Sequence, residues 1–571
     1  MRSALRSVPT RGSRSAAALG LAAVLGLTGC MGIPTAGPVR SGRVLEDEPG
    51  FALPVPEDPT VDATPEQLVY GFLSAGEAGL SDEFSAARKF LAAETAEEWD
   101  PRAGVLVYLS LPEVQLHEDG TVTAVVQVAA SVDGSGRYTE AVPGARAEEL
   151  VFQLIQDDLG QWRILAPSDG VLMSEASFER LYREIPVYFA TRDSEVLVPD
   201  LRHLPITKLA TSAVSALLEG PAPWLRDAVI SGVPENTRLS AAAVTLSDEY
   251  VALVDLAPRA GLNDNTDREL LQAQLEATLG GLPGTLVNGV QVSVGGIPWD
   301  STGVLEMSRD VRPGAGPYVL AGDQLALIES REVVPQDTAP LTGLDAHDPA
   351  VSLDGVVRVV LDGSGRLLQL PAGGAAPVPL LTVTDPVAPS IDRFDWVWTA
   401  QRAATGSVYA AGPGREAVSM RVEWLDGRSV RSLRVARDGS RIAFVSVGAD
   451  GRVSVDVASL VRDGDGRPLR IGEEPLQVGQ LLTDATQVAW VDDVTLAVLG
   501  RSGSSAGPTM HLVPVGGPIE ALSHTEGTVG IAAGRGDLAL YLLDDDGALL
   551  LRQSNSWVEI ASGVRDPVFP G

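Results

Sequence analysis

The single cysteine of the chain, Cys30, stands directly after an N-terminal segment that has the pattern of an export signal. Four arginines lie within the first 14 residues, and the stretch from Ala16 to Leu27 is apolar and uncharged. This stretch is too short to span a bilayer, but it has the length of a signal-peptide core. Because an exported chain with one cysteine cannot form an internal disulfide, hydrophobic cores must hold its domains together.

The residues that end this segment, Leu27-Thr28-Gly29-Cys30, resemble the bacterial lipobox. In a lipobox the cysteine is lipidated and becomes the first residue of the mature protein. The alternative is an ordinary signal peptide followed by an incidental or buried cysteine. Position, charge and spacing favour lipidation of Cys30, with residues 1–29 as the signal peptide. Two or more acyl chains, at about 0.8 kcal/mol per buried methylene, would anchor the protein firmly.

Length and charge limit the remaining possibilities. A chain of 571 residues exceeds one hydrophobic core and suggests three or four domains. Without the four leader arginines the formal charge of −32 becomes −36, from 39 basic and 75 acidic residues. Such a chain repels nucleic acid, so we expect no nucleic-acid partner. The five histidines are widely scattered, and we therefore expect no metal site.

Residues 30–63 are rich in proline and have no apolar period, which predicts an extended tether. A helix is expected from Thr64, because Thr64, Pro65 and Gln67 form a capping box with proline at the first helical position. Thr95 and Glu98 suggest a second capping box. Strand patterns follow, and helices before an antiparallel sheet resemble the NTF2-like cone. We therefore expect residues 64–180 to form an α+β NTF2-like domain.

Residues 181–300 alternate between strand and helix patterns, with a helix expected from Thr207 to Glu219 and another from Thr266. Several short pieces here resemble the GerMN domain, and Asn236 stands where that pattern usually has glycine. Asn tolerates a left-handed backbone, so the turn should be kept. No nucleophile and base lie among the pieces, which favours packing and turn roles over catalysis. The pieces include Leu217-Leu218-Glu219-Gly220-Pro221, Val254-Asp255-Leu256 and Ala273-Gln274-Leu275.

Residues 315–571 show short strand patterns separated by Asp-Gly and Gly-Gly turns. Weakly similar units begin near Ala350, Val435, Gln487 and Val529, and units of 40 to 50 residues indicate an all-β propeller. Five to seven blades are expected from this length. The final apolar segment, 564–569, is expected to complete a blade, so that no long sheet edge is left open.

A lipobox, an NTF2-like region, a GerMN domain and a propeller in this order resemble the LpqB family of actinobacterial lipoproteins over essentially the whole mature chain. This resemblance implies a lipid-anchored protein on the outer face of the cytoplasmic membrane. It further implies a non-enzymatic accessory regulator that works with the extracytoplasmic domain of a two-component sensor histidine kinase in cell-envelope homeostasis and division.

The sequence offers no catalytic, cofactor-binding or metal-binding set, and we expect the protein not to be an enzyme. A nucleophile elbow needs a strand before it and a helix after it, whereas Gly503-Ser504-Ser505-Ala506-Gly507 has the pattern of a polar turn followed by a strand, His511 to Val515. The segments beginning at Asp463 and Asp544 lack calcium ligands at the required positions, and both are expected to be hairpin turns. Two alternatives stay open. One is an envelope hydrolase or lactonase that uses the propeller channel, and the other is a binder of a small cell-wall ligand around Phe72, Val126 and Phe152.

The first testable prediction concerns the anchor. Cys30→Ala should leave a protein that folds but takes up no radiolabelled palmitate, because the acceptor thiol is absent. The variant should be released from the membrane or held only by its uncleaved signal. Palmitate labelling equal to that of the wild type would show that Cys30 is not the lipidated residue.

Overall fold

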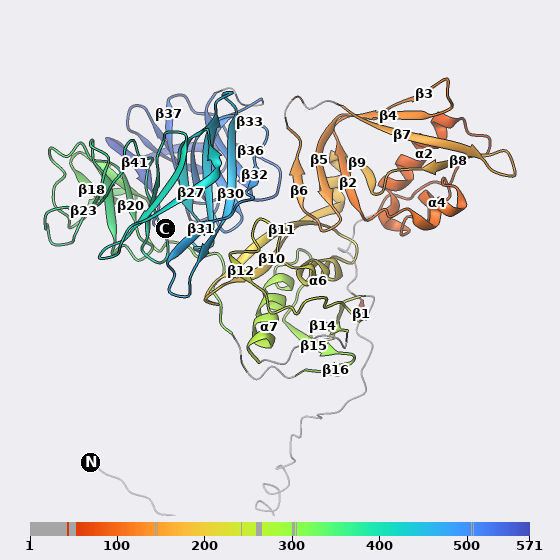
Figure 1. Cartoon of the computed structure of the whole chain (residues 1–571), viewed down its shortest axis with the longest axis horizontal. Coiled ribbons are helices and arrows are strands. Elements are labelled where there is room, and N and C mark those ends of the chain that lie inside the picture. The colour runs from red at the N-terminus through yellow and green to blue at the C-terminus, as the bar shows by residue number, and fades with distance from the viewer. Residues whose placement is uncertain are drawn as a thin grey trace, which may run out of the picture. The chain divides into compact units, whose positions relative to one another are not determined.

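The computed structural model describes Arg43–Val44 and residues 53–571, except positions 143, 145–146, 241–242, 258–264, 300–302, 304, 504 and 506. The signal segment, Cys30 and most of the predicted tether lie outside the described residues. The described part is multidomain and mostly β, with few helices (Figure 1).

The first helix, α2 (Pro65–Glu77), begins as the sequence predicts. Gln67 N donates to Thr64 Oγ1 at 3.3 Å, and Thr64 N donates to Gln67 Oε1 at 3.0 Å. This reciprocal pair satisfies backbone amides that have no partner within the first helical turn. The second predicted capping box is wrong, because helix α4 (Ala93–Glu98) already contains Thr95, whose hydroxyl donates to Leu165 O.

Two four-stranded sheets surround α2, in the orders β6-β5-β2-β9 and β3-β4-β7-β8. Only β2 and β9 pair in parallel. Phe72 of α2 packs with Trp99 and Phe152 at the centre of the shared core. The other elements of this region are η1 (Gly79–Ser81), α3 (Ser85–Arg88), β2 (Gly104–Tyr108), β3 (Glu113–Leu116), β4 (Val122–Val126), β5 (Val128–Asp133), β6 (Tyr138–Glu140), β7 (Glu148–Gln156), β8 (Trp162–Ala166), β9 (Val171–Ser174) and α5 (Glu175–Leu181).

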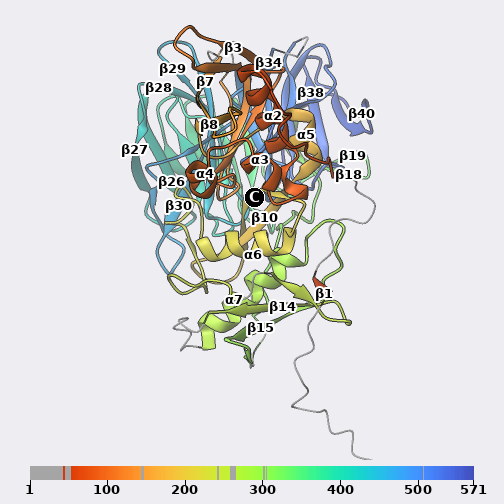
Figure 2. The same ribbon diagram turned by 90° about the vertical axis from the view of Figure 1, so that its right-hand side faces the viewer.

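The next region combines two sheets with helices α6 (Leu209–Glu219) and α7 (Asn265–Leu279), seen together in Figure 2. One apolar core draws side chains from both helices and both sheets. Helix α7 connects the parallel strands β14 and β15. The sheets contain β10 (Tyr182–Thr191), β11 (Leu197–Pro205) and β12 (Val229–Ile230), and then β1 (Arg43–Val44), β13 (Thr245–Leu246), β14 (Val251–Leu256), β15 (Gly289–Val294) and β16 (Ile297–Pro298).

The short pairing of β1 with β13 places Arg43–Val44, within the predicted tether, on the edge of the second region's sheet. The sequence did not indicate this, because two residues carry no strand period. Asn236 does adopt the predicted left-handed backbone, with φ of 62°.

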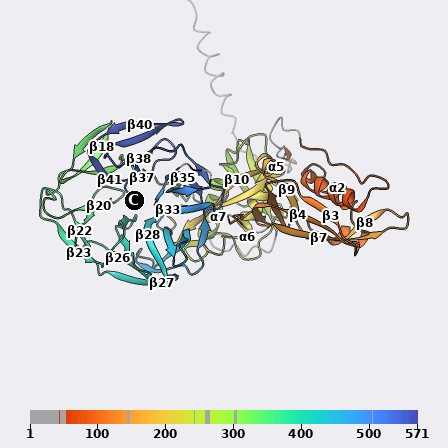
Figure 3. The same cartoon turned by 90° about the horizontal axis from the view of Figure 1, so that it is seen from above.

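The C-terminal region is a propeller (Figure 3), with six blades within the described residues, five of them four-stranded and one with a fifth strand. Strands β41, β20, β24, β28, β33 and β37 form the innermost ring. The blades are β17–β19 (Tyr318–Ala321, Gln324–Glu329, Glu332–Pro335) with β41 (Val564–Val568); β20–β23 (His347–Val351, Arg358–Leu361, Arg366–Gln369, Val378–Thr382); β24–β27 (Ser390–Ile391, Val397–Ala400, Thr405–Ala411, Val418–Asp426); β28–β31 (Arg428–Val435, Arg441–Gly448, Val453–Arg462, Pro468–Ile471), with β32 (Leu476–Val478) beside β30; β33–β36 (Leu482–Trp490, Thr495–Ser502, Thr509–Pro514, Glu520–Ala521); and β37–β40 (Thr528–Ala533, Leu540–Asp544, Leu549–Gln553, Ser556–Ala561).

Six apolar clusters lie around the ring, and each contains side chains from two neighbouring blades. In one of them Trp398 packs with Phe444 of the next blade. The same two blades share a buried ion pair, in which Arg462 donates to Asp392 at 2.5 Å. Trp398 Nε1 donates to the same carboxylate oxygen at 2.7 Å. Each blade is therefore stabilised by its neighbours.

The chain closes this ring with its own end. Strand β41 pairs antiparallel with β17, with Tyr318 opposite Val568 and Ala321 opposite Val564. This confirms that the final apolar segment completes a blade. Val564 and Val568 are buried, and they belong to the clusters on either side of the closed blade.

The second prediction tests this closure. Deleting residues 564–571 should lower the melting temperature by at least about 5 °C or cause aggregation, because it removes a buried valine from each of two clusters and exposes the edge of β17. Val568→Asp should act in the same direction, since it buries a charge. Val529→Asp, at a position 49% exposed, is the matched control and should leave melting nearly unchanged. An unaltered melting curve for the deletion would refute the closure.

Candidate functional site

The predicted lipidation site, Cys30, lies outside the described residues, so its environment is not part of this structure. Among the described helices, none combines the length and apolar character needed to cross a membrane. The described chain also contains no group of three or more His, Cys, Asp or Glu side chains placed to hold a metal ion.

A cleft of about 280 Å³ opens between α2 and the two sheets of the first region. Phe72, Trp99 and Phe152 form its aromatic wall, and all three side chains are buried. The Phe72 ring lies 5.3 Å from the Trp99 ring and 6.2 Å from the Phe152 ring, measured between centroids. Leu106 and Leu150, both only partly buried, extend the apolar lining away from this wall.

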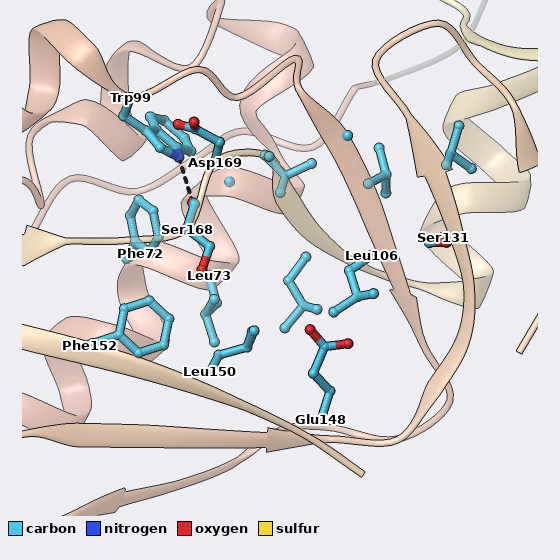
Figure 4. A pocket seen from close by; sticks show the side chains of 17 residues that line it. Phe72, Leu73, Trp99, Leu106, Ser131, Glu148, Leu150, Phe152, Ser168 and Asp169 are labelled. Atoms are coloured by element: carbon cyan, nitrogen blue, oxygen red, sulfur yellow. Dashed lines mark hydrogen bonds between the residues drawn. The ribbon is translucent and has the colours of Figure 1, made fainter. Parts of the chain in front are cut away.

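Four exposed polar residues complete the lining of the cleft: Ser131, Glu148, Ser168 and Asp169. Asp169 is held in place, because its Oδ1 accepts from Asp100 N at 3.0 Å. Trp99 Nε1 donates to Ser168 O at 3.2 Å. Figure 4 shows the aromatic rings on one side and the Glu148 carboxylate directed into the space across from them. No described residue of the lining is Lys or Arg.

This cleft corresponds in part to the cavity expected from the sequence. Phe72 and Phe152 line it as expected, but Val126 does not, because Val126 packs with Tyr108 and Leu172 in a separate small cluster. The cleft is also open to solvent and not an enclosed cavity. No pattern in the sequence distinguishes Glu148, which is one carboxylate among 75 acidic residues.

A second group of polar side chains lies where β20 and β41, the innermost strands of two adjacent blades, meet at the closure of the propeller. His347 Nδ1 lies 3.0 Å from Asp348 Oδ2, and Asp348 N donates to Asp566 Oδ2 at 3.3 Å. Arg565 donates to Ala346 O at 2.6 Å and lies 3.4 Å from Asp566. These contacts join β20 to β41 and so reinforce the closed ring.

The group at the closure has altered proton affinities. The hydrogen bond with Asp348 raises the pKa of His347, and nearby Asp566 and Asp345 act in the same direction. Burial and the Asp348 carboxylate raise the pKa of Asp566. The hydrogen bonds that the described structure gives to these side chains join them to carboxylates and to backbone groups.

The segments that the sequence assigned to turns are turns. Asp463 Oδ1 accepts from Asp465 N and Arg467 N in the hairpin between β30 and β31. Asp544 Oδ1 accepts from Asp546 N and Ala548 N in the same manner. Ser505 Oγ donates to Ser502 O in the loop between strands β34 and β35, where no helix follows.

The motif residues of the second region hold turns in place. Gln274 of α7 is fully buried; it donates to Tyr188 O at 2.9 Å and accepts from Gly232 N at 2.7 Å. Asp255 of β14 accepts from Ser293 Oγ at 2.6 Å and from Gly296 N at 2.8 Å. Both side chains are occupied by structural hydrogen bonds, as expected for packing and turn roles.

Comparison with known families decides the class of the protein. Residues 324–570 match the model described as the lipoprotein LpqB beta-propeller domain, and residues 58–179 match that of the lipoprotein LpqB N-terminal domain. The chain belongs to the LpqB family of lipoproteins. Residues 186–300 of this LpqB-family chain match a third model, described as sporulation and spore germination. Membership makes the chain a membrane-anchored lipoprotein by class, whereas the attachment residue stays a prediction.

Curated LpqB lipoproteins resemble this family member over nearly its whole length. The protein from Streptomyces avermitilis is 29% identical over 619 residues and covers 98% of each chain. That from Bifidobacterium longum is 26% identical, covering 93% of this chain and 94% of its own. Among solved structures, TolB from Acinetobacter baumannii aligns at 13% identity with a TM-score of 0.33, covering 70% of this chain and 90% of that one.

The third prediction concerns the histidine at the propeller closure. A histidine whose pKa is raised by folding contributes stability that is complete below its unfolded pKa, about 6.5, and is lost as pH rises through the higher folded pKa. The melting temperature of the wild type relative to His347→Gln should therefore fall between pH 6 and pH 8. His524→Gln, at an exposed loop position, is the control. A difference in melting temperature between wild type and His347→Gln that stays constant from pH 6 to pH 8 would contradict the coupling of His347 protonation to folding.

Proposed function

We propose that the protein is a non-enzymatic accessory regulator, anchored through Cys30 to the outer face of the cytoplasmic membrane. In this proposal it binds the extracytoplasmic domain of a sensor histidine kinase and changes phosphorylation of the response regulator, in envelope homeostasis and division. The observation that carries the proposal is membership of the LpqB lipoprotein family over nearly the whole chain.

Anchoring supports a partner within the same membrane. Two proteins confined to one surface meet at a high effective concentration, so a contact that is weak in solution becomes sufficient. The mature charge of −36 adds a long-range electrostatic attraction to a partner that has a basic patch. This attraction makes the association rate depend on salt.

The finer domain assignments belong to the same proposal. Helix α2 packed within two largely antiparallel sheets supports an NTF2-like cone for residues 64–180. The α7 crossover between β14 and β15, with Gln274 and Asp255 holding turns, supports a GerMN domain for residues 181–300. The GerMN domain and the propeller, residues 315–571, would then together supply the contact with the kinase.

The fourth prediction tests the regulator role in cells. Deletion of the gene should change the phosphorylated fraction of the response regulator, and the intact protein should restore it. An anchorless form, Cys30→Ala behind an ordinary cleavable signal peptide, should fail to restore it, because release from the membrane removes the effective concentration. A matched form of the mature chain, tethered by an unrelated transmembrane helix, should restore it, because only proximity is required.

Crosslinking in the same strains should capture the kinase ectodomain with both tethered forms. Equal phosphorylation in every strain, together with the absence of any crosslink to a kinase, would refute the regulator role. That result would favour the envelope-hydrolase alternative, for which the ionisable group around His347 and Asp566 is the place to begin substitution.

A further inference from the structure

The cleft of the first region is not explained by a contact with a kinase. Its aromatic wall is buried, but Leu106 and Leu150 beside that wall are only partly buried and face a space that is open to solvent. Apolar surface that faces water is unfavourable, and a hollow with apolar walls and a few polar groups is the usual form of a small-molecule site. The volume of about 280 Å³ lies just below the range for drug-sized ligands, roughly 300–1,000 Å³, and so suits a small ligand.

The alternation along β7 separates the cleft from the outer face of the sheet. Glu148, Leu150 and Phe152 line the cleft, whereas Glu149 and Val151 lie on the opposite face and are exposed. Successive side chains of a strand point to opposite sides, so one strand supplies a carboxylate, a leucine and an aromatic ring to the same space. The carboxylate stands at the outer end of this series and the buried ring at the inner end (Figure 4).

The charge of the lining selects the chemistry of the ligand. Glu148 and Asp169 are the charged groups of the described lining, and both are acidic. The Asp169 carboxylate accepts a backbone hydrogen bond, whereas Glu148 is exposed and directed into the cleft. An anionic head group would be repelled at this position, and a cationic one would be attracted.

We propose that this cleft binds a single-chain amphiphile with a cationic head group. The apolar chain lies against Phe72, Trp99 and Phe152, and the head group meets Glu148. The cleft is too small for a lipid with two long chains. This inference is independent of the kinase proposal, because it concerns a ligand of the first region and would hold if no kinase were bound.

The test uses the full mature chain carrying Cys30→Ala, so that no attached acyl chain competes. Decyltrimethylammonium, well below its micelle concentration, is titrated by isothermal calorimetry. It should bind at one site per chain, and decyl sulfate, which has the same chain and an anionic head, should bind at least tenfold more weakly. Equal affinity for the two probes, or no saturable binding of the cationic one, would overturn the proposal.

Two pairs of variants on β7 locate the site. Glu148→Lys should weaken decyltrimethylammonium binding at least tenfold, and Glu149→Lys, with the same charge change on the opposite face, should not. Leu150→Trp should fill the cleft and abolish binding, whereas Val151→Trp should not. Melting curves of all four variants separate loss of binding from loss of folding, and Glu148→Lys, at an exposed position, tests the site even if Leu150→Trp unfolds. Unchanged binding in Glu148→Lys would overturn the head-group assignment.

Discussion

The propeller depends on apolar contacts between neighbouring blades. Each of its six clusters is filled from two adjacent sheets, and a four-stranded sheet on its own would leave both faces open to water. Burial of apolar surface contributes about 25 cal/mol per Å², so a blade gains most of its stability only when both neighbours are present. This constraint explains why a chain without disulfides can maintain so large an all-β region.

Backbone conformation was predictable from the sequence at positions where a few adjacent residues decide it. The capping box of Thr64 and Gln67 and the left-handed backbone of Asn236 are of this kind. The hairpins of the propeller were also visible, because alternation and Asp-Gly turns act over short distances. The capping box predicted at Thr95 was wrong because local sequence does not decide this position. The Thr95 hydroxyl donates to Leu165 O, which is distant in sequence.

The cleft could be predicted only in part. Phe72 and Phe152 are conspicuous aromatic residues within apolar periods, but which strand faces which helix depends on the packing of both sheets. Val126 belongs to another cluster for that reason, and Glu148 becomes significant only once β7 lies across from Trp99. The pairing of β1 with β13 was equally invisible, because a two-residue strand is defined by its partner alone.

The pairing of β41 with β17 also has a consequence for biogenesis. Synthesis from the N-terminus produces β17 well before β41, so the two strands of one blade become available at different times. Until β41 arrives, β17 presents an unpaired edge, and the contacts between the first and last blades are incomplete. Closure of the ring therefore has to follow the synthesis of β41. A chain truncated before β41 would keep this edge exposed, as well as the apolar side chains that β41 covers.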